Sequence, residues 1–286
     1  MGDTKQHDSA LRAMTDDGAF RVVVVRTTDT VARTVEAQQV RARTAEHLGE
    51  LTTGAILVRE TMAPTHRLQA LLRNRDQKNR FVVDSHPDGG TRGLVAPADR
   101  TQPTDLDGCT LEIVRTLYSG DLHRGVVAVP EGAGMSEALM TYLQNSEQVA
   151  SMLALACVLD GERVVAAGGY LVQLLPEVGR GPLAIMAERL EEFRTIGPLL
   201  ASSDAQPGPL LDELLYGMPF TRLEERPLSW KCRCTAVRVM SSLATIPRAD
   251  ISDMIEAGQS IDLCCEFCGH VYSVSPAQLH GLLEQS

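Results

Sequence analysis

Four cysteines in the last fifth of the chain form two closely spaced pairs. The first pair is the CxC of Cys232 and Cys234, and the second is the CxxC of Cys265 and Cys268. Two such pairs, brought together by a fold, supply the four thiolates that a tetrahedral zinc site prefers. The same thiols, where solvent reaches them, can instead leave the metal and become two disulfides. The pattern therefore predicts either a structural zinc module or a redox switch.

The spacing within each pair constrains the local backbone. Gly269 follows the CxxC pair and supplies the positive φ of a tight turn that points both sulfurs at one centre. The CxC pair requires a bent backbone, because alternate residues of a flat strand point to opposite faces. A disulfide within either pair has an acceptable separation, with some strain in the CxC bond. We expect Phe267 and Tyr272 to shield the metal from one side.

Three further cysteines and one histidine have to be assigned. Cys264 directly precedes Cys265 and could replace it as a ligand, but the CxxCG turn is the usual zinc turn and favours Cys265. We interpret His270 as a surface histidine, because four thiols already complete the site. Cys109 and Cys157 stand alone in apolar or mixed surroundings, which predicts buried, unreactive thiols.

The chain divides into three predicted parts around this site. Residues 1–178 mix strand-like and helical segments without regular βα alternation, which predicts an α+β domain. Residues 179–230 are interrupted by Gly and Pro and form a predicted helical linker. Residues 231–286 carry the four cysteines and form a small zinc-binding domain, too short to build much of a core.

The N-terminal part has clear local signals. A run of valines over Phe20–Arg26 predicts a buried strand, and helical periodicity follows from about Thr30 to Thr61. Ser136 is expected to cap a helix that ends near Asn145. Short strand-like segments punctuated by turn residues predict the remaining strands, of which the last two form a hairpin: Leu68–Arg73, Phe81–Ser85, Thr91–Ala96, Leu111–Leu117, Val126–Val129, Met152–Leu159 and Val164–Leu175.

The linker contains two short predicted helices, Ala187–Ile196 and Leu210–Tyr216, between its Gly and Pro breaks. Helices of this length are held only by tertiary contacts. The simplest interpretation is a helical connector packed on the core. A second interpretation is a marginally stable segment that the unfolding of a neighbour would release.

Charge and hydropathy exclude several classes of protein. The net charge of −10 argues against nucleic acid, and the cysteine domain itself has four cationic side chains against six carboxylates. We find no apolar stretch long enough to span a membrane, and the polar, mixed-charge start predicts no signal peptide. Cysteines clustered as metal ligands suit a reducing compartment, so we expect a cytoplasmic protein.

Six blocks of the sequence occur in a characteristic order and spacing. They are Trp230-Lys-Cys-Arg-Cys-Thr, Ile251-Ser-Asp-Met-Ile-Glu, Leu263-Cys-Cys-Glu-Phe-Cys-Gly-His-Val-Tyr272, Arg92-Gly93-Leu94, Tyr142-Leu-Gln-Asn-Ser-Glu-Gln148 and Ala167-Gly-Gly-Tyr-Leu-Val-Gln-Leu-Leu-Pro176. Together these blocks resemble the heat shock protein 33 family of bacterial redox-regulated holdase chaperones, over nearly the whole chain from about Phe20. Three details depart from the family pattern: the run Thr235-Ala-Val-Arg238 is less charged than expected, Cys264 is extra, and Tyr272-Ser-Val replaces a more aromatic ending.

The resemblance implies a function and a mechanism. It implies an ATP-independent chaperone that holds unfolding client proteins, with one Zn²⁺ per chain in the reduced, inactive form. It implies that oxidation joins Cys232 to Cys234 and Cys265 to Cys268, releases the zinc and unfolds the C-terminal domain and the linker. It also implies a homodimer in the activated state.

Two other classes of function stay open on the sequence. In one, the zinc is purely structural and the N-terminal domain is an unidentified enzyme or adaptor. In the other, the thiols act as a thiol-disulfide oxidoreductase, which would need the CxxC at a helix start beside a thioredoxin-like βαβ pattern. No GxxxxGK[ST] motif is present, and Ser146-Glu147-Gln148 is interpreted as fold-specific hydrogen bonding, so we expect no enzymatic activity.

Overall fold

The computed structural model describes residues 7–75, 80–96, 106–175, 181–202 and 206–284. The chain forms two compact units, Met1–Lys231 and Cys232–Ser286. The predicted boundary between residues 178 and 179 lies outside the described residues. The division of the first unit into a core and a linker therefore stays a prediction.

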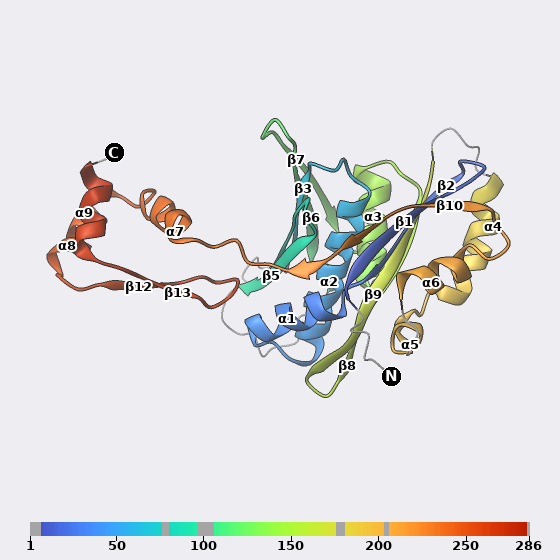
Figure 1. The fold of residues 1–286 in the computed structure, drawn as a ribbon, viewed down its shortest axis with the longest axis horizontal. Coiled ribbons are helices and arrows are strands. Elements are labelled where there is room, and N and C mark those ends of the chain that lie inside the picture. The colour runs from blue at the N-terminus through green and yellow to red at the C-terminus, as the bar shows by residue number, and fades with distance from the viewer. Residues whose placement is uncertain (1–6, 76–79, 97–105, 176–180, 203–205, 285–286) are drawn as a thin grey trace. The chain divides into compact units, whose positions relative to one another are not determined.

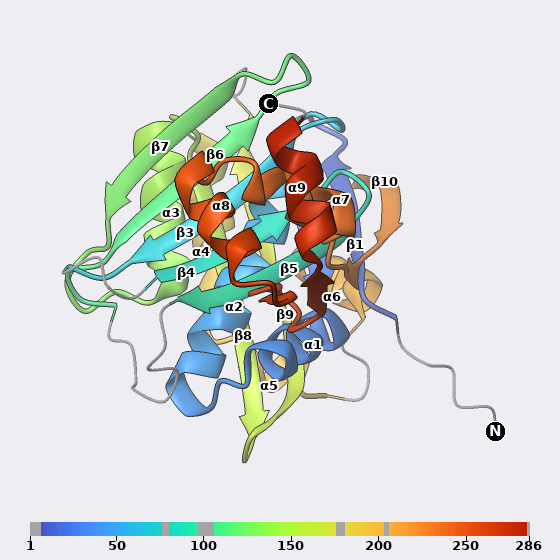
Figure 2. The same cartoon turned by 90° about the vertical axis from the view of Figure 1, so that its left-hand side faces the viewer.

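Two sheets form the framework of the first unit. The five-stranded sheet is antiparallel, with the strand order β10-β1-β2-β9-β8, and the six-stranded sheet has the order β11-β5-β4-β3-β6-β7. Figure 2 shows the central strands of the six-stranded sheet side by side. The strands are β1 (Ser9–Thr15), β2 (Phe20–Arg26), β3 (Arg67–Arg73), β4 (Arg80–Ser85), β5 (Gly90–Ala96), β6 (Thr110–Thr116), β7 (Leu122–Ala128), β8 (Ser151–Asp160), β9 (Arg163–Leu174), β10 (Phe220–Pro227) and β11 (Ser229–Trp230).

Three helices fill the space between the two sheets (Figure 1). They are α1 (Thr28–Gln38), α2 (Ala42–Glu60) and α3 (Met135–Ser146). Helix α2 packs against strands of both sheets, so residues all round it are buried, including Leu48, Leu51 and Ile56. The single inward-facing side expected from the helical periodicity is therefore extended to the whole circumference of α2. The main core of the unit lies here.

A second, separate core lies on the other face of the five-stranded sheet. Short helices from the predicted linker cover this face: α4 (Gly181–Leu190), α5 (Gly197–Leu200) and α6 (Pro207–Leu214), with the 3₁₀ turn η1 (Glu191–Phe193). Leu211 and Leu214 of α6 pack in the same cluster as Val22 and Val24 of β2. The linker is therefore a fourth layer, stacked on the outer face of the sheet.

The structure confirms most of the predicted elements and corrects two predicted helices of the N-terminal part. The helical run from Thr30 to Thr61 is two helices, since Gln39 and Ala42 have positive φ values of 53° and 46° and break it. Gly134, rather than Ser136, precedes the first turn of α3, and the Ser136 hydroxyl instead accepts a hydrogen bond from the Leu155 amide at 3.3 Å.

The linker helices begin earlier than predicted, and the linker is not only helical. Pro182 and Pro207 lie in the first turns of α4 and α6, where the missing N–H of proline has no partner to lose. These prolines therefore start helices, although we had expected them to lie in the breaks between helices. Strand β10, which the sequence pattern did not predict, pairs with β1. Strand β1 was also missed, in a stretch interpreted as polar.

A buried carboxylate gives a prediction for the six-stranded sheet. Asp84 is 0% exposed, and its carboxylate accepts hydrogen bonds from Arg92 at 2.9 Å and from Arg67. Burial acts to raise the pKa of Asp84, but the two guanidinium groups outweigh it and the pKa lies below the usual 3.8. We expect Asp84→Asn to reduce the free energy of unfolding at pH 7 by about 3–5 kcal/mol, because two cations lose their buried partner.

The pH dependence of this effect has a definite sign. A lowered carboxyl pKa contributes stability that is present above pH 3.8 and is lost as the pH falls through the folded-state value. The difference between wild type and Asp84→Asn, measured by urea unfolding, should therefore shrink below about pH 4. The exposed Asp160→Asn is the matched control and should behave as wild type. A difference that stays constant down to pH 2 would contradict the prediction.

Glu50, which lies where the main core meets the linker, gives a second prediction about stability and pH. It lines a cavity of about 400 Å³ together with Glu191 and Arg194 of the linker. Burial, with a smaller effect of Glu46, raises the pKa of Glu50 to about 8. Between pH 4.5 and 8, Glu50 is therefore protonated in the folded protein and ionised in the unfolded chain. The free energy of unfolding falls as the pH rises through this window.

Removing this charge should remove that part of the pH dependence. We expect Glu50→Gln to have a higher urea midpoint than wild type at pH 8.5 and a similar midpoint at pH 5. Glu36→Gln, an exposed change on α1, is the matched control. Equal midpoints for wild type and Glu50→Gln at both pH values would show that Glu50 ionises normally.

The second unit is small. It contains α7 (Ala236–Leu243), α8 (Arg248–Glu256), the hairpin β12 (Ile261–Cys264) and β13 (Val271–Val274), and α9 (Pro276–Glu284). The apolar side chains that are fully buried in it are Leu243, Ile251, Val274 and Leu279, surrounded by partly buried ones. Such a core is small for a unit that folds independently.

Candidate metal centre

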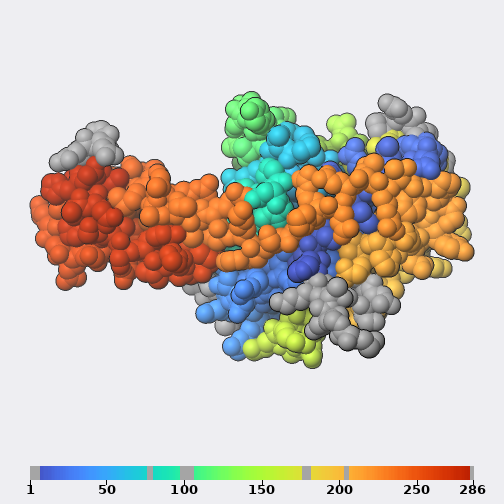
Figure 3. Space-filling model, viewed as in Figure 1, coloured from blue at the N-terminus to red at the C-terminus, as the bar shows by residue number. Residues whose placement is uncertain are grey.

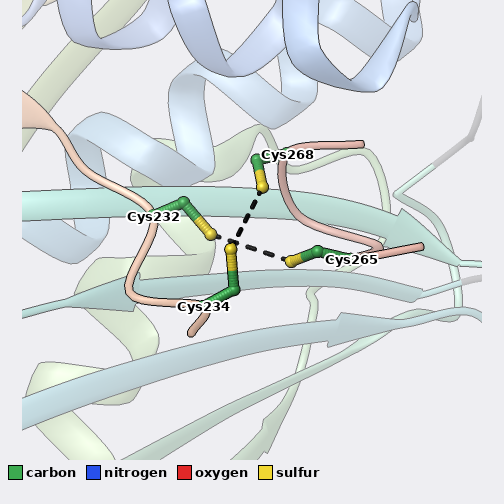
Figure 4. Close-up of side chains that lie close together, drawn as sticks. All are labelled: Cys232, Cys234, Cys265 and Cys268. Atoms are coloured by element: carbon green, nitrogen blue, oxygen red, sulfur yellow. Dashed lines mark hydrogen bonds between the residues drawn. The ribbon is translucent and has the colours of Figure 1, made fainter. Parts of the chain in front are cut away.

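The four paired cysteines come from two loops of the second unit. Cys232 and Cys234 lie in the irregular segment that leads into α7, and Cys265 and Cys268 lie in the turn between β12 and β13. Figure 4 shows the four side chains pointing toward one centre. The structure therefore brings together all four residues that the sequence singled out.

The sulfur atoms form a compact cluster. The Sγ atoms of Cys232 and Cys265 are 3.8 Å apart, those of Cys234 and Cys268 are 3.5 Å apart, and all four lie within 4.8 Å of one another. A tetrahedron of thiolates bound to zinc at about 2.3 Å has sulfur–sulfur edges of about 3.8 Å. The cluster therefore has the ligand set and about the size that a tetrahedral metal ion requires.

The CxxC turn has the geometry that its sequence predicts. Gly269 has a φ of 72°, and its amide donates to the Cys265 carbonyl at 2.8 Å. The Cys265 amide in turn donates to the His270 carbonyl at 2.9 Å, which closes the hairpin. The backbone amides of Phe267 and Cys268 point at the Cys265 sulfur. They stabilise the thiolate form that a metal requires.

The electrostatics of the cluster favour a cation. Desolvation raises the pKa of both Cys265 and Cys268, and for Cys268 the hydrogen bonds with the three neighbouring thiols raise it further. Four thiolates this close cannot coexist without a positive charge between them. A divalent cation supplies that charge and makes deprotonation favourable. Protons and a metal ion therefore compete for the four sulfur atoms.

The remaining predicted positions behave as expected. Cys264 is exposed and lies outside the cluster, at the end of β12. His270 is exposed and stacks edge-on against Tyr272, with ring centroids 4.5 Å apart. Cys109 and Cys157 are buried in the main core of the first unit, and burial raises the pKa of Cys157 to about 12. Both are therefore poor nucleophiles.

One contact of the site was only partly foreseen. Tyr272 was expected to shield the metal from one side, and in addition its hydroxyl donates a hydrogen bond to the Cys234 sulfur at 3.2 Å. This bond raises the pKa of Tyr272 to about 12. A hydrogen bond to a ligand sulfur orients it and tunes the metal. Its sequence signal is an aromatic residue four positions after a CxxC.

The block around Glu147 is structural. The Tyr142 hydroxyl donates to the Glu147 carboxylate, which also pairs with Arg115 at 2.9 Å. The block therefore ties the end of α3 to β6, as its interpretation as fold-specific hydrogen bonding predicts. Among the residues described, no helix is long and apolar enough to cross a membrane.

The fold and the site define a class: an α+β protein with two sheets, a helical layer over one of them, and a small C-terminal unit organised around four cysteines. The description of the matching family model is "Hsp33 protein", and the match covers residues 8–275. The chain belongs to the Hsp33 family.

Individual relatives agree with this assignment over their full length. The 33 kDa chaperonin of Syntrophotalea carbinolica is 30% identical, with 96% of this chain and 99% of the relative aligned. The 33 kDa chaperonin of Streptococcus pyogenes is 27% identical, with 96% and 98% aligned. A solved structure of the 33 kDa chaperonin of Thermotoga maritima superposes with a TM-score of 0.83 at 22% identity, over 98% of both chains. That likeness confirms the fold.

Proposed function

We propose that this protein is a redox-regulated, ATP-independent holdase chaperone of the cytoplasm, without enzymatic activity. The observation that carries the proposal is the four-thiol cluster in a unit with only a small apolar core. Zinc is the metal that suits four thiolates in a tetrahedron. Cys232, Cys234, Cys265 and Cys268 are the proposed ligands of one Zn²⁺ per chain.

Zinc binding would be the main source of stability for the second unit. Structural zinc sites of small peptides contribute about 10–16 kcal/mol of folding free energy at pH 7. The four buried apolar side chains of the core supply about 6–12 kcal/mol, and the entropy cost of ordering the unit must be subtracted from this. Loss of the metal is therefore expected to unfold the unit.

Oxidation is the proposed trigger. Cys232 with Cys234, and Cys265 with Cys268, would each give two electrons to an oxidant such as a peroxide, which is reduced to water, and form a disulfide. A disulfide sulfur is no longer a thiolate ligand, so zinc is released. In the cluster all four sulfurs are neighbours, so the pairing within each CxC and CxxC rests on the family resemblance rather than on proximity.

Release of the linker would expose the client-binding surface. The linker helices cover Leu11, Val22, Val24 and Tyr170 on the outer face of the five-stranded sheet. This cluster is separate from the main core, so it can open while the main core stays folded. The apolar face would then bind unfolding client proteins. We propose that the activated form is a homodimer.

Light scattering from thermally unfolding citrate synthase tests the proposal. One sample contains the reduced, zinc-loaded protein and the other contains the peroxide-oxidised protein, with zinc release followed by a chromogenic chelator. We expect suppression of aggregation only after oxidation, with about one zinc released per chain. Zinc retained under peroxide and equal behaviour of both samples would instead support a structural zinc module. Catalysed reduction of a substrate disulfide would support an oxidoreductase.

A further inference from the structure

Strand β10 is the outermost strand of the five-stranded sheet. It pairs antiparallel with β1 from Ser9↔Pro227 to Thr15↔Phe220, with one register shift between Arg12 and Ala13. It lies at the C-terminal end of the predicted linker, directly before the cysteine unit in sequence. Figure 3 shows the linker residues, in gold and orange, spread over the surface of the first unit.

The attachment of β10 depends on its main chain. Six of its eight side chains are exposed and the other two are only partly buried, and Leu223 is 54% exposed. The side-chain hydrogen bond and the ion pair to β1 are polar, since Ser9 donates to Glu225 at 2.7 Å and Arg12 pairs with Glu224. The one apolar anchor is Phe220 at the start of the strand, which packs against the second core. From Thr221 onward the ladder of backbone hydrogen bonds therefore provides most of the attachment, and it places few demands on the sequence of the strand.

Strand β1 does not depend on β10 for its place in the sheet. Five of its seven side chains are buried, with Ala10 in the main core and Leu11 and Ala13 in the second core. It also pairs along its length with β2. If β10 left with the rest of the linker, β1 would stay in the sheet and present an unpaired edge of backbone N–H and C=O groups.

We infer that the edge of β1 covered by β10 is a capture site for an extended segment of an unfolded client, which adds to the sheet as a strand in place of β10. The inference rests on the proposed function, because it requires release of the linker. Main-chain pairing gives affinity with little sequence selectivity, which suits a chaperone of many clients. Leu11 and Ala13 place the newly exposed apolar face directly beside the captured strand.

This arrangement also explains the composition of β10. Three of its four charged residues are exposed on this outermost strand, namely Arg222, Glu224 and Glu225, while Arg226 is partly buried and donates to the Pro87 carbonyl at 2.9 Å. Charges on an edge strand prevent pairing with other chains. In the resting protein β10 thus covers the edge of β1, which could pair with other chains, and presents in its place a charged edge that does not.

Hydrogen exchange measured by mass spectrometry tests the inference. The oxidised protein is compared alone and in complex with reduced, carboxymethylated α-lactalbumin, a permanently unfolded polypeptide. On oxidation we expect faster exchange in residues 220–227 and at the edge of residues 9–15. On complex formation, exchange in residues 9–15 should slow by roughly tenfold or more, while residues 220–227 stay fast. Strand β7, the edge strand of the other sheet, is the control and should not change.

Three outcomes would overturn the inference. In the first, a complex forms but hydrogen exchange in residues 9–15 stays fast. In the second, complex formation slows exchange in residues 220–227, so that β10 returns to the sheet. In the third, exchange in β10 stays slow throughout, although client is bound. Failure of the proposed function gives a different signature, because oxidised protein would then neither release zinc nor suppress citrate synthase aggregation in the light-scattering experiment.

Discussion

Replacement of Cys265 by serine is expected to abolish zinc binding and unfold the second unit while the first unit stays folded. A serine hydroxyl does not ionise at neutral pH and is a poor zinc ligand. The site therefore keeps only three thiolates and lacks the fourth protein ligand of a structural zinc site. Since the metal contributes about 10–16 kcal/mol in small zinc domains, its loss leaves an apolar core too small to offset the entropy of ordering the unit. Zinc content by atomic emission and hydrogen exchange of residues 232–284 measure the two effects.

Cys264→Ser is the matched control, one residue away. Cys264 is exposed and lies outside the sulfur cluster, so this variant should keep one zinc per chain and a folded second unit. The pair of variants also decides which of the two adjacent cysteines is the ligand. Loss of zinc in Cys264→Ser with retention in Cys265→Ser would reverse the assignment.

The site could be predicted from the sequence because its chemistry is local. A CxxC followed by glycine fixes its own turn, and the structure shows that turn with Gly269 at a φ of 72°. Only the meeting of the two pairs depends on the fold. The role of Tyr272 was harder to predict, because its contact with the Cys234 sulfur joins residues that lie far apart in the sequence.

The parts of the fold that were missed lack such local signals. Strand β10 reads Phe-Thr-Arg-Leu-Glu-Glu-Arg-Pro, and its six exposed side chains give no apolar pattern, because main-chain pairing with β1 holds it. The break between α1 and α2 has no Gly or Pro, and Gln39 and Ala42 adopt positive φ because both helices are packed between two sheets. Tertiary contacts determined these features.

Leu211→Asp is expected to make the reduced, zinc-loaded protein active without oxidation. Leu211 is 0% exposed and packs in the second core between α6 and the five-stranded sheet. Loss of its burial and introduction of a charge there should cost about 3–5 kcal/mol, which exceeds the margin that holds a short helix in place. Zinc should remain bound, because the four cysteines lie in the other unit.

The matched control is Leu223→Asp, the same change at a 54% exposed position of β10. It should leave the reduced protein inactive, because no buried apolar surface is lost. Suppression of citrate synthase aggregation by reduced Leu211→Asp, with one zinc retained per chain, would separate the release of the linker from the loss of the metal. The opposite result would be a reduced Leu211→Asp protein that keeps its zinc and shows fast hydrogen exchange in the linker, but does not suppress aggregation. It would show that the outer face of the sheet alone does not bind clients.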